Sequence, residues 1–242
     1  MAGETFRFRK FLVKHNSSSM RVGTDAVLLG AWAGDGGENV HLYRSVLDVG
    51  CGCGVIALMA AQRFPNAKVH GIDIDASSVM EATENARQSI FSDRVEFSNV
   101  DVRKLAVEPS HERYDLILCN PPYYTEDTLP PDKRRSMARN TLHLSFEDLI
   151  KSVCLLMSED GVFALIIPMQ ARDFFVSEAL VNGLHIRREC RVKTVSPKTP
   201  KRVLLEFGFQ VYDHLKYEDL ILQDADGERS ADYSLLCKDF YL

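Results

Sequence analysis

A regular alternation of apolar runs and helical patterns begins at Ser45 and constrains the fold more than any other feature of the sequence. Short runs rich in β-branched residues predict strands, and the longer periodic segments between them predict helices. The predicted strands span residues 45–50, 68–73, 94–101, 114–119 and 161–168, and the predicted helices span about 55–63, 76–89, 146–157 and 170–182. This order indicates an α/β fold of the Rossmann-like, doubly wound kind with a mostly parallel sheet.

The C-terminal part of the chain has a different pattern. Two extended segments, about 185–195 and 202–212, flank the sequence SPKTPK, whose prolines and polar residues suit an exposed connection. These segments predict an antiparallel C-terminal hairpin at the edge of the sheet.

Composition excludes several classes of protein. With 45% apolar and 26% charged residues, the chain has the composition of an ordinary globular protein. No run approaches the roughly 20 apolar residues that cross a bilayer, so a cytoplasmic protein is expected. The six cysteines lack CxxC spacing and the seven histidines lack metal-ligand or triad spacing, which predicts reduced thiols and no metal site.

A glycine-rich turn follows the first predicted strand. The segment DVGCGCG runs from Asp48 to Gly54, directly after an apolar run and before a predicted helix. Gly50, Gly52 and Gly54 permit a tight turn, and they let a ligand approach the backbone on either side of Cys51. The sequence therefore predicts a site for a nucleotide-like cofactor.

Two cofactors suit such a turn, NAD and S-adenosylmethionine. Both use an acid at the end of the second strand, here Asp73, to hold ribose hydroxyls. The dinucleotide fingerprint requires a glycine at position 55, where the chain has Val55. Asp48 would repel a pyrophosphate but could attract the ammonium of S-adenosylmethionine. We therefore expect S-adenosyl-L-methionine, with Asp101 and Val102 near its adenine edge.

The tetrapeptide Asn120-Pro121-Pro122-Tyr123 follows the strand that is predicted to end at Cys119. Ligands bind at the carboxyl ends of parallel strands in such folds. The lone pair of an exocyclic amine on adenine is delocalised, so the site must accept the N–H protons of that amine. The Asn120 side-chain oxygen and the Pro121 carbonyl suit this role, because the two prolines restrict the backbone there. Tyr123 could stack on the target base.

The sequence resembles class I amino-methyltransferases with an NPPY motif and, within them, the bacterial tRNA1(Val) (adenine-37-N6)-methyltransferases. The resemblance covers nearly the whole chain and is carried by FRFRKFLVKHNSSSMRVGTDAVLLGAWA, DVGCGCGVIALMAAQR, GIDID, NPPYY, ARNTLHLSFEDLI, SPKTPKRVLLEF and KDFYL. It implies a class I methyltransferase fold and N6 methylation of a tRNA adenine next to the anticodon. It also implies that Gly23 and Thr24 touch the methionine end of the cofactor, and that Asn120 borders the cofactor as well as the target.

We interpret residues 1–242 as a single methyltransferase domain, in which 1–44 form an N-terminal extension or cofactor lid and 45–242 form the catalytic core. Three basic segments, 7–21, 133–139 and 187–202, interrupt a chain whose net charge is −5. Because lysine and arginine clusters contact RNA phosphates, we expect these segments to converge on one tRNA-binding face of a monomer.

Three other functions fit part of this pattern. NPPY also serves planar amides, so the chain could be a protein glutamine N5-methyltransferase. It could also be a non-catalytic RNA-binding protein that retains the fold, although the intact Asn120 and Tyr123 argue against this. A hydride-transfer enzyme that binds NAD is the remaining alternative.

Overall fold

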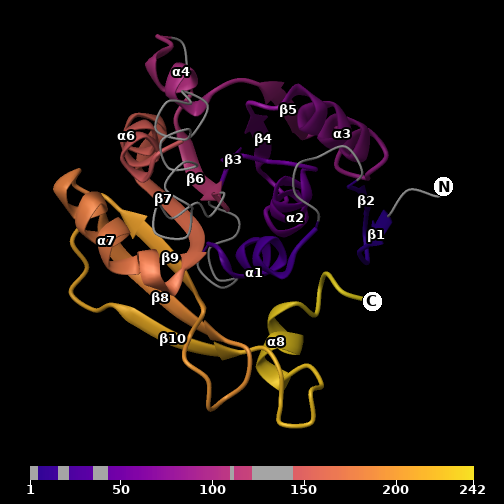
Figure 1. Ribbon diagram of the computed structural model, residues 1–242. Coiled ribbons are helices and arrows are strands. Elements are labelled where there is room, and N and C mark those ends of the chain that lie inside the picture. Colours follow the sequence, from indigo (N-terminus) through magenta and orange to yellow (C-terminus); the bar gives the residue numbers. More distant parts are fainter. Residues whose placement is uncertain (1–4, 16–21, 35–42, 110–111, 122–143) are drawn as a thin grey trace, which may run out of the picture.

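The computed structural model describes residues 5–15, 22–34, 43–109, 112–121 and 144–242 (Figure 1). These residues form an eight-stranded sheet in the order β10-β8-β9-β7-β6-β3-β4-β5. Its strands are β3 (Ser45–Val49), β4 (Lys68–Asp73), β5 (Val95–Asn99), β6 (Tyr114–Cys119), β7 (Met157–Pro168), β8 (His185–Lys193), β9 (Arg202–Gly208) and β10 (Lys216–Ile221). Only β9 is antiparallel to its neighbours in this sheet. The predicted mostly parallel α/β sheet is therefore confirmed.

Helices cover both faces of the sheet, and each face has its own apolar core. One face carries α1 (Thr24–Trp32), α2 (Val55–Arg63) and α3 (Ala76–Arg87). The other carries α4 (Val102–Val107), α6 (Phe146–Leu156) and α7 (Arg172–Val181), which follows a 3-10 turn (Met169–Ala171). A small hairpin of β1 (Thr5–Arg7) and β2 (Leu12–Lys14) and the helix α8 (Ala231–Leu236) complete the described elements.

Helix α6 shows how the local sequence produces these elements. Ser145 caps the helix, because its hydroxyl oxygen accepts a hydrogen bond from the Asp148 N–H. The apolar side chains then recur every three or four residues along one face, and this face is fully buried. It consists of Leu149, Ile150, Val153 and Leu156.

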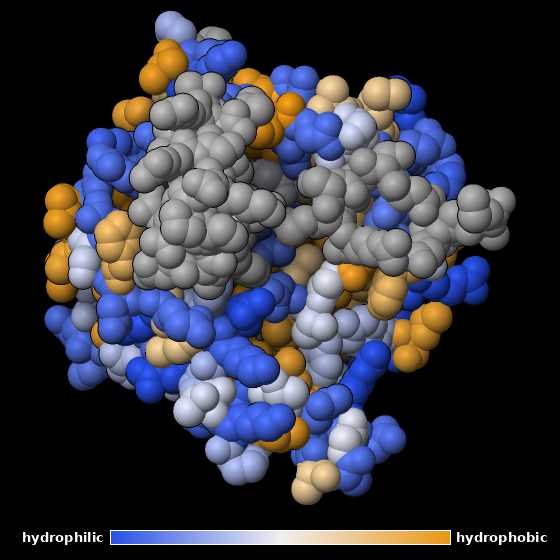
Figure 2. Space-filling view, viewed as in Figure 1, coloured by the Kyte–Doolittle hydropathy of each residue, from blue (hydrophilic) through white to orange (hydrophobic). Residues whose placement is uncertain are grey.

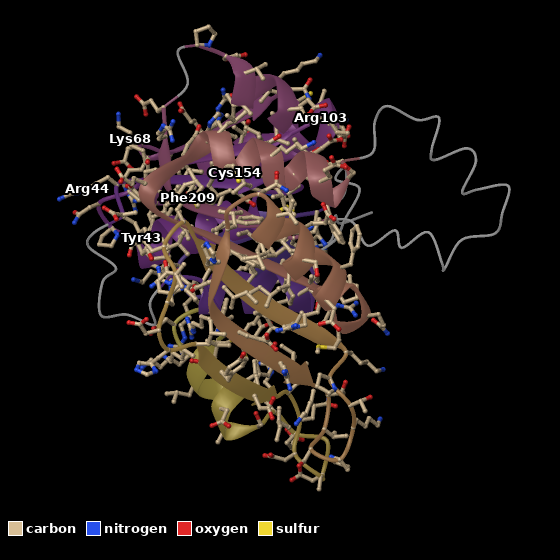
Figure 3. The ribbon with its side chains drawn as sticks, turned by 90° about the vertical axis from the view of Figure 1, so that its left-hand side faces the viewer. Tyr43, Arg44, Lys68, Arg103, Cys154 and Phe209 are labelled. Carbon is tan, nitrogen blue, oxygen red and sulfur yellow. The ribbon has the colours of Figure 1, made fainter. Side chains whose placement is uncertain are left out.

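The parallel strands give the sheet one edge at which all their carboxyl ends lie, called the carboxyl edge below. Strands β3, β4, β5, β6 and β7 all end there, and the view in Figure 1 looks onto this edge. Figure 3 shows the sheet from the side, with Arg103 toward the carboxyl edge and Arg44 and Lys68 at the opposite, amino edge.

The predicted C-terminal hairpin exists, but its predicted place at the sheet edge is wrong. Strands β8 and β9 are antiparallel, as expected, yet β10 lies outside β8 and runs parallel to it. The second segment also ends earlier than expected, at Gly208. The sequence of β10 has little apolar alternation, so it was not predicted as a strand. Ion pairs of Glu218 with Arg188 and of Asp219 with Lys193 help to hold it against β8.

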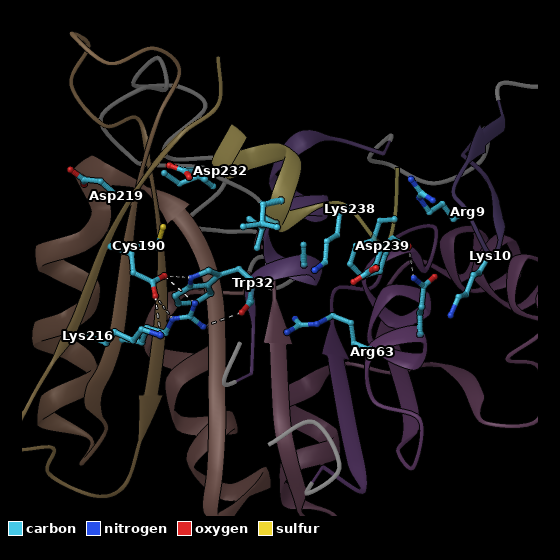
Figure 4. Close-up of a pocket in the computed structure, with 18 residues that line it drawn as sticks. Arg9, Lys10, Trp32, Arg63, Cys190, Lys216, Asp219, Asp232, Lys238 and Asp239 are labelled. Carbon is cyan, nitrogen blue, oxygen red and sulfur yellow. Dashed lines mark hydrogen bonds and ion pairs between the residues drawn. The ribbon is translucent and has the colours of Figure 1, made fainter. Parts of the chain in front are cut away.

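A buried charge network holds the end of α1 on the sheet. Glu206 of β9 is fully buried; its carboxylate accepts a hydrogen bond from the Gly34 N–H at 2.7 Å. It lies 3.8 Å from a guanidinium nitrogen of Arg188. Arg188 stacks 4.1 Å from the Trp32 ring centroid and pairs with Glu218 at 3.0 Å (Figure 4). The network therefore holds the C-terminal end of α1, and this helps to position the N-terminal end of the helix, at Thr24, on the carboxyl edge.

We predict that Glu206→Ala lowers the free energy of unfolding by about 3–5 kcal/mol, because it leaves the buried Arg188 charge without this partner. Urea denaturation measures the loss. Glu159→Ala, which removes an exposed carboxylate from β7, is the matched control and should change stability by less than about 0.5 kcal/mol. Equal effects of the two substitutions would contradict the prediction.

Candidate active site

The glycine turn lies between β3 and α2 at the carboxyl edge. Gly50, Gly52 and Gly54 all have positive φ, at 72°, 52° and 82°, a conformation that other residues adopt only with strain. The Gly50 and Cys51 N–H groups donate to the Ile72 carbonyl at 2.9 and 3.0 Å, so the turn is fixed on the end of β4. The turn predicted from the sequence is confirmed.

The glycines of this turn serve two different purposes. Among the described residues, a Cβ at Gly50 or Gly52 would meet no atom within 4 Å, so open space lies over these positions. At Gly54 a Cβ would lie 2.8 Å from the Phe97 ring. Gly54 is therefore required for packing, whereas Gly50 and Gly52 leave room in which a ligand could lie against the backbone.

Asp73 ends β4 with its carboxylate against the glycine turn. One oxygen accepts from the Gly52 N–H at 2.9 Å, and the other accepts from the Asp75 N–H at 2.9 Å. These two bonds fix the carboxylate at the carboxyl edge, and each oxygen keeps acceptor capacity for a hydroxyl group. Ile74, which follows Asp73, is 49% exposed and leaves an apolar side chain beside this carboxylate.

Asp48 lies beneath the turn and is completely buried. Its Oδ2 accepts from the Ala57 N–H at 3.0 Å, while Oδ1 has no hydrogen-bond partner within the described part of the chain. Burial, together with the smaller effect of the nearby Asp73 charge, raises the pKa of the carboxyl to about 7, although the hydrogen bond from Ala57 lowers it. A buried acceptor without a partner is costly, so this site fits a ligand that brings a cationic donor.

Asp101 and Val102 lie at the start of α4, next along the edge from Asp73. The Asp101 carboxylate caps α4 by accepting from the Arg103 N–H at 2.9 Å. The Arg103 guanidinium also donates to both of its oxygens, and these bonds lower the pKa of Asp101. The carboxylate is thus already engaged. The N–H of Val102, at the first helical position, has no partner within a helix and is the better candidate for a ligand contact.

Asn120 and Pro121 extend from the end of β6, one strand from the glycine turn. Val49 of β3 pairs with Cys119 of β6, so Asn120 follows β6 at the level at which Gly50 follows β3. The side chain of Asn120 is half-buried. Pro122 and Tyr123 lie outside the described residues, as does the basic segment 133–139.

Gly23 and Thr24 begin α1, and both are exposed at the carboxyl edge. The position of Gly23 and Thr24 follows from Asp25, the residue after them, because its carboxylate accepts a hydrogen bond from the Arg202 guanidinium at 2.9 Å. Arg202 in turn pairs with Pro168 at the carboxyl end of β7. The start of α1 therefore lies on the β7 side of the edge.

Asn85 of α3 is a residue that the sequence analysis missed. It is 1% exposed, and its amide donates to the carbonyls of Cys53 and Lys14 at 2.9 Å each. Its oxygen accepts from the Lys14 N–H at 2.9 Å. Asn85 thus ties the N-terminal hairpin to the glycine turn. No motif marks an asparagine within a polar helix as such a link.

The basic segments do not all face the same edge. Arg9 and Lys10, at the tip of the β1–β2 hairpin, line a groove of about 1130 Å³ together with Arg63 at the end of α2 (Figure 4). Helix α2 runs from the carboxyl edge to the amino edge, so these cations lie toward the amino edge. Arg188 of segment 187–202 lines the same groove, whereas Lys198 and Lys201 of that segment follow β8 toward the carboxyl edge. Within the described residues, segments 7–21 and 187–202 therefore meet only in part.

The described ranges contain neither a candidate metal site nor a candidate membrane span. None of these residues form a group of three or more histidine, cysteine, aspartate or glutamate side chains that could hold a metal ion. No helix in the described parts of the chain has the length and apolar character to span a membrane. All six cysteines are free thiols.

A glycine turn and an acid on adjacent strands, with Asn-Pro on a third, define the methyltransferase class, and comparison with known proteins agrees. A family described as a methyltransferase domain matches residues 43–217. A crystal structure of a predicted O-methyltransferase from Agrobacterium tumefaciens superimposes with a TM-score of 0.63 at 20% identity, covering 89% of this chain and 96% of that one. This likeness supports the class I methyltransferase fold.

Full-length relatives define the family. A protein of Phocaeicola vulgatus named tRNA1(Val) (adenine(37)-N6)-methyltransferase is 39% identical over 242 residues, which are 100% of this chain and 99% of the relative. A Bacteroides fragilis protein of the same name is 38% identical with the same coverage. The chain belongs to the tRNA1(Val) (adenine(37)-N6)-methyltransferase family, which confirms the resemblance seen in the sequence. It is a methyltransferase, and its methyl donor is S-adenosyl-L-methionine.

We predict that the stability of Asp48→Asn relative to the unmodified protein, both without cofactor, is greater at high pH than at low pH. The raised pKa, about 7 against an ordinary 3.8, means that the folded chain binds this proton more tightly than the unfolded chain. The associated stability is present below about pH 4 and is lost as the pH rises through about 7. An amide cannot ionise and avoids this loss.

Urea denaturation at pH 4.5 and pH 8 measures the difference in stability between Asp48→Asn and the unmodified protein. The difference should shift in favour of the variant at pH 8. Asp93→Asn, which changes an exposed carboxylate, is the matched control. A difference for Asp48→Asn that is the same at both pH values would contradict the prediction.

Proposed function

We propose that this protein transfers the methyl group of S-adenosyl-L-methionine to N6 of adenine 37 in tRNA1(Val). The observation that carries the proposal is the full-length likeness to relatives of that name. The position of Asn120 supports it, because this side chain follows the strand next to the glycine turn. A donor held at the turn and an amine held at Asn120 would then be neighbours.

For the cofactor, we propose a division of roles along the carboxyl edge. S-adenosyl-L-methionine supplies an electrophilic methyl group on a sulfonium. The backbone of Gly50, Cys51 and Gly52 would lie against it, in the open space over the turn. Gly54 shapes the turn, and Asp48 offers its unused oxygen to the ammonium group.

The nucleoside end of the cofactor would lie farther along the same edge. We propose that Asp73 accepts hydrogen bonds from the ribose hydroxyls and that the exposed side chain of Ile74 packs on the adenine ring. Because Arg103 occupies the Asp101 carboxylate, the N–H of Val102 is the proposed contact to the adenine edge, with Asp101 orienting it.

For the target amine, we propose that the Asn120 side-chain oxygen and the Pro121 carbonyl accept its two N–H protons. This arrangement draws the nitrogen lone pair out of conjugation and directs it at the methyl group. Pro122 would hold the Pro121 carbonyl in place, and Tyr123 would stack on the extruded base. Gly23 and Thr24 would close the methionine end, and the N-terminal segment 1–44 is proposed as a lid.

Labelled methyl transfer tests the proposal. The protein is incubated with labelled S-adenosyl-L-methionine and total tRNA from cells that lack the enzyme, and the modified nucleoside is mapped. We expect N6-methyladenosine at position 37. Label on a different nucleoside atom, or on a glutamine of a protein substrate but not on tRNA, would overturn the proposal. Tight tRNA binding without transfer would indicate a binding protein instead.

We predict that Asn120→Ala lowers the rate of methyl transfer at least about 100-fold, the scale on which loss of one preorganised group acts. Cofactor affinity should change much less, because the turn and Asp73 remain. Single-turnover kinetics and S-adenosyl-L-methionine titration measure the two effects separately. Asn66→Ala, at an exposed position near the amino edge, is the control. Unchanged transfer by Asn120→Ala would contradict the assigned role.

A further inference from the structure

The carboxyl edge continues past Asn120 to β7 and β9, where two surface elements meet. Pro168 at the end of β7 pairs with Arg202 at the start of β9. The Met169 N–H also donates to the Lys201 carbonyl at 3.1 Å. The β9 end of the connection 194–201 therefore lies against the 3-10 turn that leads into α7. Figure 2 looks onto this same edge of the protein.

Phe174 is an unusual residue on this surface. It lies in the first turn of α7 and is 60% exposed, whereas the adjacent Phe175 is fully buried. The Phe146 ring lies close to it, with centroids 6.4 Å apart and planes at 36°, and Phe146 itself packs edge-on against Phe175 at 5.0 Å. Phe174 is thus supported from the core side while most of its surface faces solvent. Such a ring is a preformed platform for stacking.

The cations of segment 187–202 divide into two groups. Five of the seven lie within 4.0 Å of an acid: Arg187 with Glu206, Arg188 with Glu218, Arg191 with Glu189, Lys193 with Asp219 and Arg202 with Asp25. Lys198 and Lys201 are exposed and form no ion pair with any described residue. Both belong to the connection 194–201.

Three acids on the α7 and α1 side of this surface have cationic partners. Glu189 pairs with Arg172 at 2.6 Å, and Asp173 pairs with Arg172 at 2.8 Å. Asp25 pairs with Arg202, as described above. The acidic turn 224–228 lies near the β8 end of the connection 194–201, because the Gln223 N–H donates to the Thr194 carbonyl at 2.9 Å. Lys201, at the β9 end, lies on the side of β7 and the 3-10 turn.

We propose that Phe174, Lys198 and Lys201 form one surface that binds the RNA nucleotides flanking the target adenine. The ring stacks on an unpaired base, and the ammonium groups contact phosphates. An exposed stacking ring together with two lysines that form no ion pair in the described structure matches single-stranded RNA, which presents exposed bases and a charged backbone together. This inference rests on the proposed function and adds to it the part of the protein that holds the RNA beside Asn120.

Kinetics of methyl transfer to tRNA test the role of the ring. Phe174→Ala should raise the KM for tRNA about 5- to 100-fold, with an unchanged affinity for S-adenosyl-L-methionine. Phe174→Tyr, which keeps a stacking ring, should restore most of the loss. Leu180→Ala removes a similarly exposed side chain (56%) near the other end of α7 and should leave the KM unchanged.

Salt dependence tests the role of the lysines. In the double variant Lys198→Ala/Lys201→Ala, the slope of log affinity for tRNA against log salt should fall by about one for each lost phosphate contact. Lys68→Ala, at the amino edge of the sheet (Figure 3), is the control and should leave the slope unchanged.

The outcomes separate this inference from the proposed function. Transfer to tRNA by the unmodified protein, together with an unchanged KM for Phe174→Ala and an unchanged salt slope for the lysine variant, would overturn the surface and leave the proposed function standing. Failure of the unmodified protein to methylate tRNA would overturn the proposed function and this inference with it. Equal losses in the control variants would show a general structural effect and would also overturn the surface.

Discussion

The parallel register of β4, β3 and β6 is the constraint on which the site depends. Val49 pairs with Ile72 on one side and with Cys119 on the other. Because these partners are the last or next-to-last residues of their strands, the three chains leave the sheet at the same level. A shift by one residue would turn alternate side chains to the opposite face. It would also separate the glycine turn from Asp73 and Asn120.

The space for a ligand at this edge is obtained at a cost to the stability of the cofactor-free protein. Asp48 is buried with one oxygen unused, and a more apolar residue of similar size would suit the core better. Glycines 50 and 52 leave open space that larger side chains would occupy. Such local conflicts with good packing are expected at functional sites, where binding a ligand compensates for them.

Charge counted along the sequence differs from charge available on the surface. Segment 187–202 has seven cations and one acid in sequence, yet its pairing with Glu206, Glu218, Asp219 and Asp25 neutralises much of that charge in three dimensions. These acids are close to the segment because β8 lies between β9 and β10 and because the first turn of α1 reaches Arg202 at the start of β9. The two cations of this segment that form no ion pair with a described residue, Lys198 and Lys201, lie in the connection between β8 and β9.

The sequence by itself determined strands β3 to β6, helices α2 and α3, the glycine turn, the Asn-Pro that follows β6, and the family, but it did not predict helix α4. These features depend on local patterns: apolar periodicity, the backbone freedom of glycine and the rigidity of proline. It did not reveal β10, because that strand is held by parallel pairing and ion pairs with β8 rather than by an apolar pattern.

The tertiary structure alone decided which polar groups were already engaged. It showed that Arg103 occupies the carboxylate of Asp101, that Asn85 joins the N-terminal hairpin to the glycine turn, and that Phe174 is exposed beside a buried neighbour. These facts depend on residues that are distant in sequence or on the packing of one helix against another. A linear pattern carries residue types and spacing, whereas hydrogen bonds and burial depend on which surfaces the fold brings together.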